Sequence, residues 1–230
     1  MTPYYQHDGI TIYHGDSREI MPSLAGLVVC DPPYNVGYHY DEHGDSMKAE
    51  DYQELLRLTC RPKSVVIHYP EEICTLSWTL KEIPAEMVAW IYHSNVPRQH
   101  RCIAWFGVKP DFRLDSQAYK NPEDKRIARR MSEGKKARLY DWWQIDQVKN
   151  VSGEKTLHPC QIPVSLMRRI IRITPPATII DPFCGSGTTL RAAKDLGRAA
   201  IGIELSERYC EIAAQRMSQE VLIKETYGTV

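Results

Sequence analysis

The stretch DPFCGSGTTLRAAKDLG, residues 181–197, has the pattern of a strand end followed by a tight turn and a helix. It continues ATIID (177–181), a short apolar run of the kind that is buried on both faces of a parallel sheet. Gly185 and Gly187 permit a turn whose backbone approaches a ligand closely, and Gly197 is a C-terminal helix cap. A strand, turn and helix in this order are typical of nucleotide-binding α/β proteins, although a purely structural turn explains the pattern about as well.

Similar strand-like runs recur along the chain. They are ITIYHGD (10–16), GLVVCD (26–31), SVVIHY (64–69) and AAIGIE (199–204). Helical patterns alternate with them at 47–60, 163–173, 188–197 and 206–217. This alternation predicts an α/β fold with a doubly wound, mostly parallel sheet and helices on both faces. Ligands of such folds bind at the carboxyl ends of the strands, so we looked for chemistry there.

Composition sets further bounds on the protein. With 230 residues, 43% hydrophobic and 25% charged, we expect one folded domain over residues 1–230. The sequence has no run of about 18 apolar residues and no signal-peptide pattern, which favours a cytoplasmic protein without membrane contact. Seven cysteines without a C-x-x-C pair indicate reduced thiols, and His39 and His43 lack a third ligand nearby, so we expect no metal.

The middle of the chain carries a local concentration of positive charge. The formal net charge of the chain is zero, but residues 120–138 hold eight basic and three acidic side chains, a balance of +5. We expect about 107–150 to be an insertion on the α/β body. Its basic side chains include Arg126, Arg129, Arg130, Lys135 and Lys136. A solvated helix or loop explains the same charges equally well.

The run CDPPYN, residues 30–35, also follows a predicted strand. Two successive prolines, Pro32 and Pro33, hold the Pro32 carbonyl stiffly. Asp31 and that carbonyl offer two acceptors, and Tyr34 offers a ring for stacking. Two acceptors and a ring match the exocyclic amino group of a nucleobase, which has two hydrogens and a π-face. A rigid turn without catalytic function is the simple alternative.

Three motifs taken together resemble a known family. DPPYN (31–35), HPCQIP (158–163) and DPFCGSGTT (181–189) occur in the order found in S-adenosylmethionine-dependent amino-group DNA methyltransferases of the permuted β group. In that group the D-P-P-Y half precedes the F-x-G-x-G half. The resemblance covers about 1–70 and 150–218. It implies a Rossmann-like methyltransferase fold with permuted motif order, S-adenosylmethionine as cofactor, double-stranded DNA as substrate and a prokaryotic or phage-infected cell.

The resemblance also implies roles for individual residues. The catalytic residues would be Asp31, Pro32, Pro33 and Tyr34. The cofactor-binding residues would be Asp16, Asp181, Phe183, Gly185, Gly187 and Glu204. The insertion at about 107–150 would be a target-recognition region, with Arg126, Arg129, Arg130, Lys135 and Lys136 as its DNA-binding residues. Glu204 also ends a predicted strand seventeen residues after Gly187, where a carboxylate can accept hydrogen bonds from ribose hydroxyls.

The tripeptide Pro159-Cys160-Gln161 matches the P-C-Q found at the nucleophile of methyltransferases that act on carbon 5 of cytosine. In those enzymes P-C-Q follows the Gly-rich motif and precedes an E-N-V element. Here it precedes the Gly-rich motif, and E-N-V does not occur in the sequence. We therefore predict that Cys160 is not a nucleophile.

The sequence is compatible with more than one target base and more than one class of substrate. D-P-P-Y is commoner among adenine-N6 members of the family and S-P-P-Y among cytosine-N4 members, which favours adenine and restriction–modification. Cytosine N4 and amino groups of RNA stay open. A Rossmann oxidoreductase lacks its G-x-G-x-x-G here, and a silent DNA-binding module does not need an intact D-P-P-Y. The small recognition region suggests a short site or a homodimer that shares the task.

Overall fold

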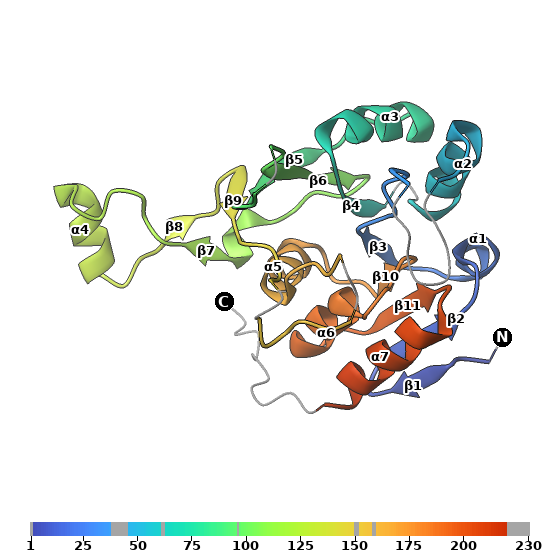
Figure 1. Cartoon of the computed structure of the whole chain (residues 1–230). Helices are drawn as coiled ribbons and strands as arrows, with labels where there is room; N and C mark the ends of the chain where they lie inside the picture. The colour runs from blue at the N-terminus through green and yellow to red at the C-terminus, as the bar shows by residue number, and fades with distance from the viewer. Residues whose placement is uncertain are drawn as a thin grey trace.

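The computed structural model describes residues 2–37, 46–60, 63–95, 97–149, 152–157 and 160–219. Its main-sheet strands are β1 (Tyr5–His7), β2 (Ile10–His14), β3 (Leu27–Cys30), β4 (Ser64–His68), β5 (Glu86–Ile91), β6 (His100–Phe106), β9 (Trp142–Gln144), β10 (Ile179–Asp181) and β11 (Ala200–Glu204). Within the described residues they form one sheet in the order β1-β2-β11-β10-β3-β4-β6-β5-β9 (Figure 1).

Helices lie on both faces of this sheet (Figure 1). They are α1 (Ser17–Ile20), α2 (Ala49–Thr59), α3 (Pro70–Leu80), α5 (Val164–Ile173), α6 (Thr188–Asp195) and α7 (Glu207–Ser218), with 3₁₀ turns at Met21–Ser23 and Phe112–Leu114. One buried cluster packs the sheet against α1, α2 and α3, and a second packs it against α5, α6 and α7. No helix in the described parts of the chain is long and apolar enough to cross a membrane.

The central strands show why the apolar runs are continuous. In β4, Val65 and Ile67 belong to the cluster that includes α5 to α7, whereas Val66 belongs to the opposite cluster. Successive strand residues point to opposite faces, and both faces are covered, so every position of the strand is apolar or fully buried. The prediction of a sheet with helices on both faces is confirmed.

Strand direction decides which residues meet. β2, β11, β10, β3 and β4 are all parallel, so their carboxyl ends lie at one edge of the sheet. β6 runs antiparallel between β4 and β5, and therefore begins at that same edge. The edge thus includes the ends of these five parallel strands and the start of β6.

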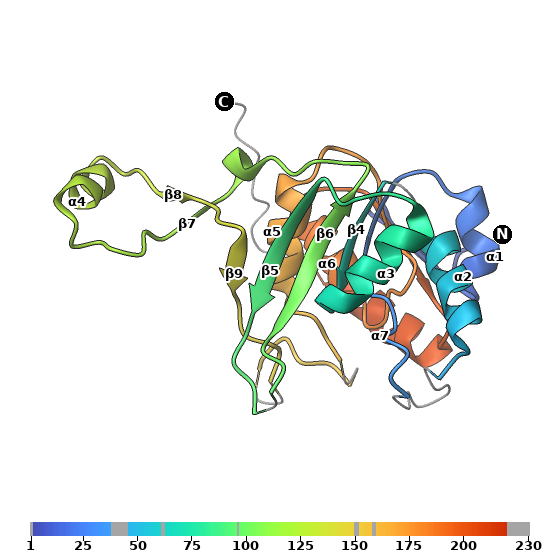
Figure 2. The same cartoon turned by 90° about the horizontal axis from the view of Figure 1, so that it is seen from above.

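The basic segment forms an arm that projects from the body (Figure 2). A short sheet of β7 (Ser116–Gln117) and β8 (Ala137–Arg138) leads to α4 (Lys125–Ser132). No residue of α4 is buried, and its first turn is held by the Asp124 carboxylate, which accepts hydrogen bonds from two backbone amides. The arm, from β7 to β8, lies in the middle of the expected range 107–150. Near the end of that range, β9 belongs to the main sheet.

The base of the arm is tied to α5 by ion pairs. Asp115 lies 2.9 Å from Arg169 Nε and 3.5 Å from Arg172 Nη1, and all three side chains are largely buried. A single carboxylate thus binds two cations of one helix. This fixes the point at which the arm leaves the body.

Candidate active site

A cavity of about 310 Å³ opens at the edge where the parallel strands end. Its lining joins residues far apart in the sequence, including Asp16, Asp31, Tyr34, Phe183, Gly185 and Glu204. Pro32 and Pro33 line the cavity as well, so eight of the ten predicted catalytic and cofactor-binding residues border it. The catalytic and cofactor motifs therefore share one space.

Two predicted cofactor residues lie differently. Asp181 lines a smaller adjoining cavity of about 50 Å³, together with Asp31 and Phe183. Gly187 lies at the start of α6 with φ +78°, and a Cβ there would approach the Ala213 Cβ to 3.0 Å. Gly187 therefore allows α6 to pack closely against α7, rather than bordering the cavity.

The Gly-rich turn is held by carboxylates at both ends. Asp181 Oδ1 accepts a 3.0 Å hydrogen bond from the Phe183 amide. Glu204 Oε2 accepts a 2.7 Å bond from the Gly185 amide, and its Oε1 accepts a 2.9 Å bond from the Ser206 amide. Both Glu204 carboxylate oxygens are thus oriented by backbone amides at the wall of the cavity. Burial raises the pKa of Asp181 to about 7.

Asp16 lies two residues after β2 and caps α1. Its carboxylate accepts hydrogen bonds from the Arg18 amide at 2.8 Å and from Arg18 Nε at 3.0 Å. The hydrogen bonds from Arg18 lower the pKa of Asp16 although partial burial opposes them. An ionised acceptor is thus kept at the rim of the cavity.

Asp31 and Tyr34 form a closed pair within the D-P-P-Y turn. The Tyr34 hydroxyl donates a 2.5 Å hydrogen bond to Asp31 Oδ1. Burial raises the pKa of Asp31, while Arg101 and the Tyr34 hydroxyl oppose that rise. Because Oδ1 is engaged, Oδ2 is the oxygen of Asp31 that is directed to other partners.

Two residues support this turn from behind. The His68 ring stacks on Tyr34 at 4.3 Å between centroids and 21° between planes. His68 Nδ1 accepts a hydrogen bond from the Tyr69 amide, so Nε2 carries the proton and faces the Tyr52 hydroxyl at 2.8 Å. Tyr52 in turn donates to the Pro33 carbonyl at 2.7 Å. Burial lowers the pKa of His68 to about 3, so the ring is neutral.

Arg101 at the start of β6 is a site residue that the sequence analysis missed. Its side chain is only 14% exposed, lines the cavity and lies 3.7 Å from Asp31 Oδ2. Sequence reasoning pointed to the ends of parallel strands, but β6 is antiparallel, so its first residues reach the edge where those strands end.

Cys160 is exposed and also lines both cavities near Asp31. The neighbouring Gln161 is buried and holds a loop, since its Oε1 accepts from the Thr156 amide at 2.9 Å and its Nε2 donates to the Glu154 carbonyl at 2.8 Å. The remaining residues of the P-C-Q and H-P elements, 158 and 159, lie outside the described residues. That Cys160 is not a nucleophile stays a prediction.

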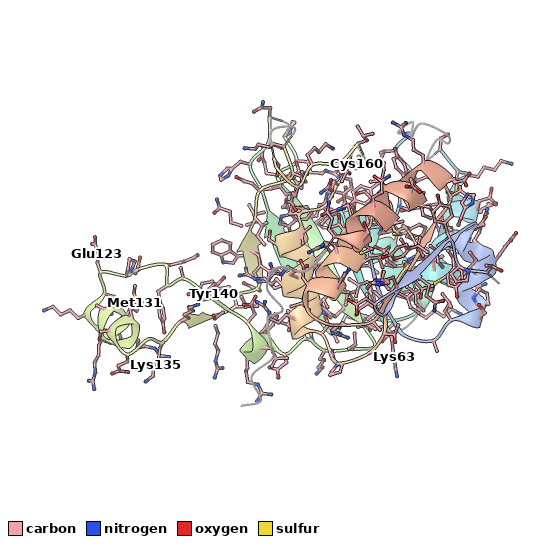
Figure 3. All side chains as sticks on the ribbon, turned by 90° about the horizontal axis from the view of Figure 1, so that it is seen from below. Lys63, Glu123, Met131, Lys135, Tyr140 and Cys160 are labelled. Carbon is pink, nitrogen blue, oxygen red and sulfur yellow. The ribbon has the colours of Figure 1, made fainter. Side chains whose placement is uncertain are left out.

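The five predicted DNA-binding residues lie on the arm, away from the cavity. Figure 3 shows Lys135 at the outer end of the arm with Glu123 and Met131, whereas Cys160 is on the body. Arg130 Nε donates to the Tyr119 hydroxyl at 2.8 Å, and Arg129 Nε lies 3.2 Å from Glu133. The arm therefore presents cations that are oriented by neighbours but remain exposed.

Among the residues that the structure describes, no group of three or more His, Cys, Asp or Glu side chains could hold a metal ion. His39 and His43 lie outside the described residues.

A parallel sheet that brings a D-P-P-Y turn and an acidic, Gly-rich cleft into one cavity defines the class of amino-group methyltransferases. A family model for DNA methylases matches residues 25–215, and the chain belongs to this family. S-adenosylmethionine is the methyl donor of these enzymes, and the chain is a DNA amino-methyltransferase of the N6-adenine or N4-cytosine type.

Named relatives agree with this assignment. The type II methyltransferase M.ScaI of Streptomyces caespitosus is 30% identical over 95% of this chain and 84% of its own length. The structure is similar to that of the M1.HpyAVI–SAM complex, with a TM-score of 0.62, 24% identity and coverage of 91% of this chain and 100% of the other. It is also similar to the cytosine-N4-specific PvuII DNA methyltransferase, with a TM-score of 0.66, 18% identity and coverage of 97% and 91%.

The residues present fit this cofactor. The cavity volume lies at the lower end of the range typical of small-molecule sites, about 300–1,000 Å³. Its lining combines two carboxylates that can accept from hydroxyl and amino groups, Asp16 and Glu204, with the apolar side chains of Phe183 and Leu205. Carboxylates beside apolar side chains suit the adenosine part of S-adenosylmethionine, which has hydroxyl and amino donors and an aromatic ring.

Proposed function

We propose that this protein methylates the exocyclic N6 of adenine in a base flipped out of double-stranded DNA. The observation that carries the proposal is the single cavity that joins Asp31, Pro32 and Tyr34 to Phe183, Gly185 and Glu204. Such a cavity can hold a methyl donor and an amine acceptor in contact. The D-P-P-Y form of the tetrapeptide supports adenine, and N4 of cytosine is the second candidate because it offers the same two hydrogens.

The amino group of adenine is conjugated with its ring and is a weak nucleophile, so the site must raise its electron density. Asp31 Oδ2 and the Pro32 carbonyl would accept its two N–H bonds, favouring a pyramidal nitrogen and stabilising the positive charge that develops there. When bound, S-adenosylmethionine supplies an electrophilic methyl group. Asp31 would then accept the proton that the methylated nitrogen releases.

Base flipping has a cost of a few kcal/mol, and stacking offsets part of it. Tyr34 would supply the stacking surface, worth about 1–3 kcal/mol per base. Its ring is held rigid from behind by His68. A ring that is already fixed loses little entropy when the base stacks on it.

The cofactor-binding roles follow from the cavity walls. Glu204 would accept hydrogen bonds from ribose hydroxyls, and Asp16 would accept from the adenine end of the cofactor. Phe183 would pack beside it, and the backbone of Gly185 would permit close approach.

The arm would contact DNA phosphates through Arg126, Arg129, Arg130, Lys135 and Lys136. Its exposed cations and its projection from the body support this role (Figure 3). A homodimer would let two arms share a recognition site. The substrate would be DNA in the cytoplasm of a bacterial or phage-infected cell.

The test is to incubate the purified protein with S-adenosylmethionine and mixed-sequence unmethylated DNA, and to identify the methylated nucleoside by mass spectrometry. N6-methyladenine supports the proposal, and N4-methylcytosine changes the base but keeps the site. Production of 5-methylcytosine would show that Cys160 acts as a nucleophile. Transfer to RNA alone would replace DNA as the substrate.

A further inference from the structure

The guanidinium of Arg101 lies where a flipped base would have to enter. Its Cζ atom is 4.9 Å from the centroid of the Tyr34 ring, and its Nη1 is 3.7 Å from Asp31 Oδ2. Oδ1 is held by the Tyr34 hydroxyl, so Arg101 faces the one oxygen left for an amine. Both Arg101 and His68 lie against the Tyr34 ring. Arg101 lines the cavity, and among the described residues that line it His68 does not appear. Arg101 therefore covers the stacking ring and the acceptor from the cavity side.

A guanidinium group has the features of the ligand that this site is built to receive. It is planar, carries N–H donors in its plane and stacks on aromatic rings, as a nucleobase with an exocyclic amino group does. We propose that Arg101 is a placeholder for the target base: it fills the base site of the DNA-free enzyme, and a base enters by displacing it. The inference rests on the proposed transfer to a base amine at Asp31.

The contacts of Arg101 are suited to such a displacement. The 3.7 Å separation from Asp31 exceeds a hydrogen-bond distance, and Nε has no hydrogen-bond partner among the described residues. Three other rings surround the same guanidinium, with Cζ 5.3 Å from Trp90, 5.9 Å from Tyr92 and 6.0 Å from Tyr69. Contacts with these three rings would stay available to Arg101 after it leaves Tyr34, and they would offset part of the cost of separating it from Asp31.

Displacement of Arg101 has a consequence for base selection. When the cation leaves, the largely buried carboxylate of Asp31 loses its nearest positive partner. A base with an exocyclic amine restores a donor to Oδ2, whereas thymine has no amino group to offer. The free-energy cost of leaving a buried acceptor unpaired is larger than the net free energy gained from forming one hydrogen bond. The placeholder thus adds discrimination before the methyl group is transferred.

Steady-state kinetics on mixed-sequence duplex DNA test this inference, with the wild-type protein compared with Arg101→Ala and Arg101→Lys. Removing the placeholder leaves the base site free, so we expect Arg101→Ala to lower KM for DNA about fivefold or more, with kcat within about twofold of wild type. Arg101→Lys retains a charge near Asp31 but loses the planar stack, and we expect an intermediate KM.

Arg98→Ala is the matched control. Arg98 also lies over an aromatic ring, 3.9 Å from the centroid of Tyr69, but it pairs with Glu71 at 2.6 Å and is 47% exposed. We expect its kinetics to equal those of wild type. Calorimetric binding of S-adenosylmethionine to each variant reports whether the cavity is intact.

Two outcomes would overturn the inference in distinguishable ways. A kcat about tenfold lower in Arg101→Ala and in Arg101→Lys, with KM unchanged or raised, would mean that Arg101 acts during transfer and does not hold the base site. The proposed function would still stand, because wild-type methylation of DNA is measured separately. Absence of any methyl transfer to DNA by the wild-type protein would remove both the proposed function and the inference.

Discussion

The hydroxyl of Tyr52 donates a 2.7 Å hydrogen bond to the carbonyl oxygen of Pro33. This bond connects the buried face of α2 to the D-P-P-Y turn. It also engages the second proline carbonyl, which leaves the Pro32 carbonyl as the acceptor for an amine. The same hydroxyl lies 2.8 Å from His68, which stacks on Tyr34, so one side chain supports both the backbone and the ring of the turn.

We expect Tyr52→Phe to lower kcat about tenfold while leaving the affinity for S-adenosylmethionine unchanged. The substitution removes one hydroxyl and keeps the ring in the core, so its effect comes from a Pro33 carbonyl that is free to rotate. Single-turnover methylation assays and calorimetry measure the two quantities. Tyr5→Phe in β1, away from the cavity, is the control. Equal kcat in both variants would contradict a positioning role for Tyr52.

Asp31→Ala tests the acceptor itself. We expect a loss of roughly 100-fold or more in kcat, because the variant lacks the carboxylate that stabilises charge on the nitrogen. Cofactor binding should be nearly intact. Asp16→Ala should show the reverse pattern, with weaker cofactor binding and kcat largely retained at saturating S-adenosylmethionine. If Asp31→Ala instead abolished cofactor binding, the two carboxylates would have been assigned the wrong roles.

The sequence predicted the parallel strands and the D-P-P-Y and Gly-rich turns because both signals are local. A strand covered on two faces must be apolar along its length, as in Val65 to Ile67. Proline fixes φ, and glycine permits the positive φ that Gly185 and Gly187 adopt, regardless of the remaining chain. The proximity of Asp31 to Glu204 then follows from parallel pairing alone.

Arg101, Tyr52 and His68 could not be assigned in the same way. Arg101 reaches the cavity only because β6 is antiparallel, and strand direction is not written in the pattern of apolar residues. Tyr52 looked like an ordinary core residue of a helix, since its burial hides the one hydroxyl that matters. Helix α4 buries none of its residues, because it projects from the body, and its first turn is held by the Asp124 cap.

Asp181→Asn is expected to change how stability depends on pH. Burial raises the pKa of Asp181 from its usual 3.8 to about 7, so between these values the folded protein binds more protons than the unfolded chain. The free energy of unfolding should therefore fall as pH rises through this window, by up to about 1.4 kcal/mol per pH unit. Asparagine cannot ionise, and it can still accept the bond from the Phe183 amide.

Urea unfolding of the two proteins at about pH 5 and pH 8 measures this effect. The comparison is needed because His68 contributes with the opposite sign: its pKa is lowered to about 3, so stability falls as pH drops below its usual 6.5. Both proteins share that contribution, and their difference isolates Asp181. We expect the variant to gain stability relative to wild type as pH rises. A difference that is constant with pH would mean that Asp181 ionises normally in the fold.

Reversing two charges on the arm, Arg129→Glu with Arg130→Glu, should weaken DNA binding and flatten its dependence on salt. Each phosphate contact that is lost removes about one unit from the slope of log affinity against log salt concentration. Both residues are exposed on α4, where no side chain is buried, so the fold should be unaffected. Fluorescence anisotropy with a mixed-sequence duplex at several salt concentrations measures affinity and slope together.

The control must change net charge equally without touching the arm. Lys63 precedes β4 and Lys81 follows α3, so both lie at the sheet edge opposite the cavity, and Figure 3 shows Lys63 on the body. Lys63→Glu with Lys81→Glu should lower affinity slightly through the overall charge and leave the salt slope close to that of wild type. If both double variants behaved alike, the arm would act only through net charge, and sequence recognition would have to be sought around the cavity.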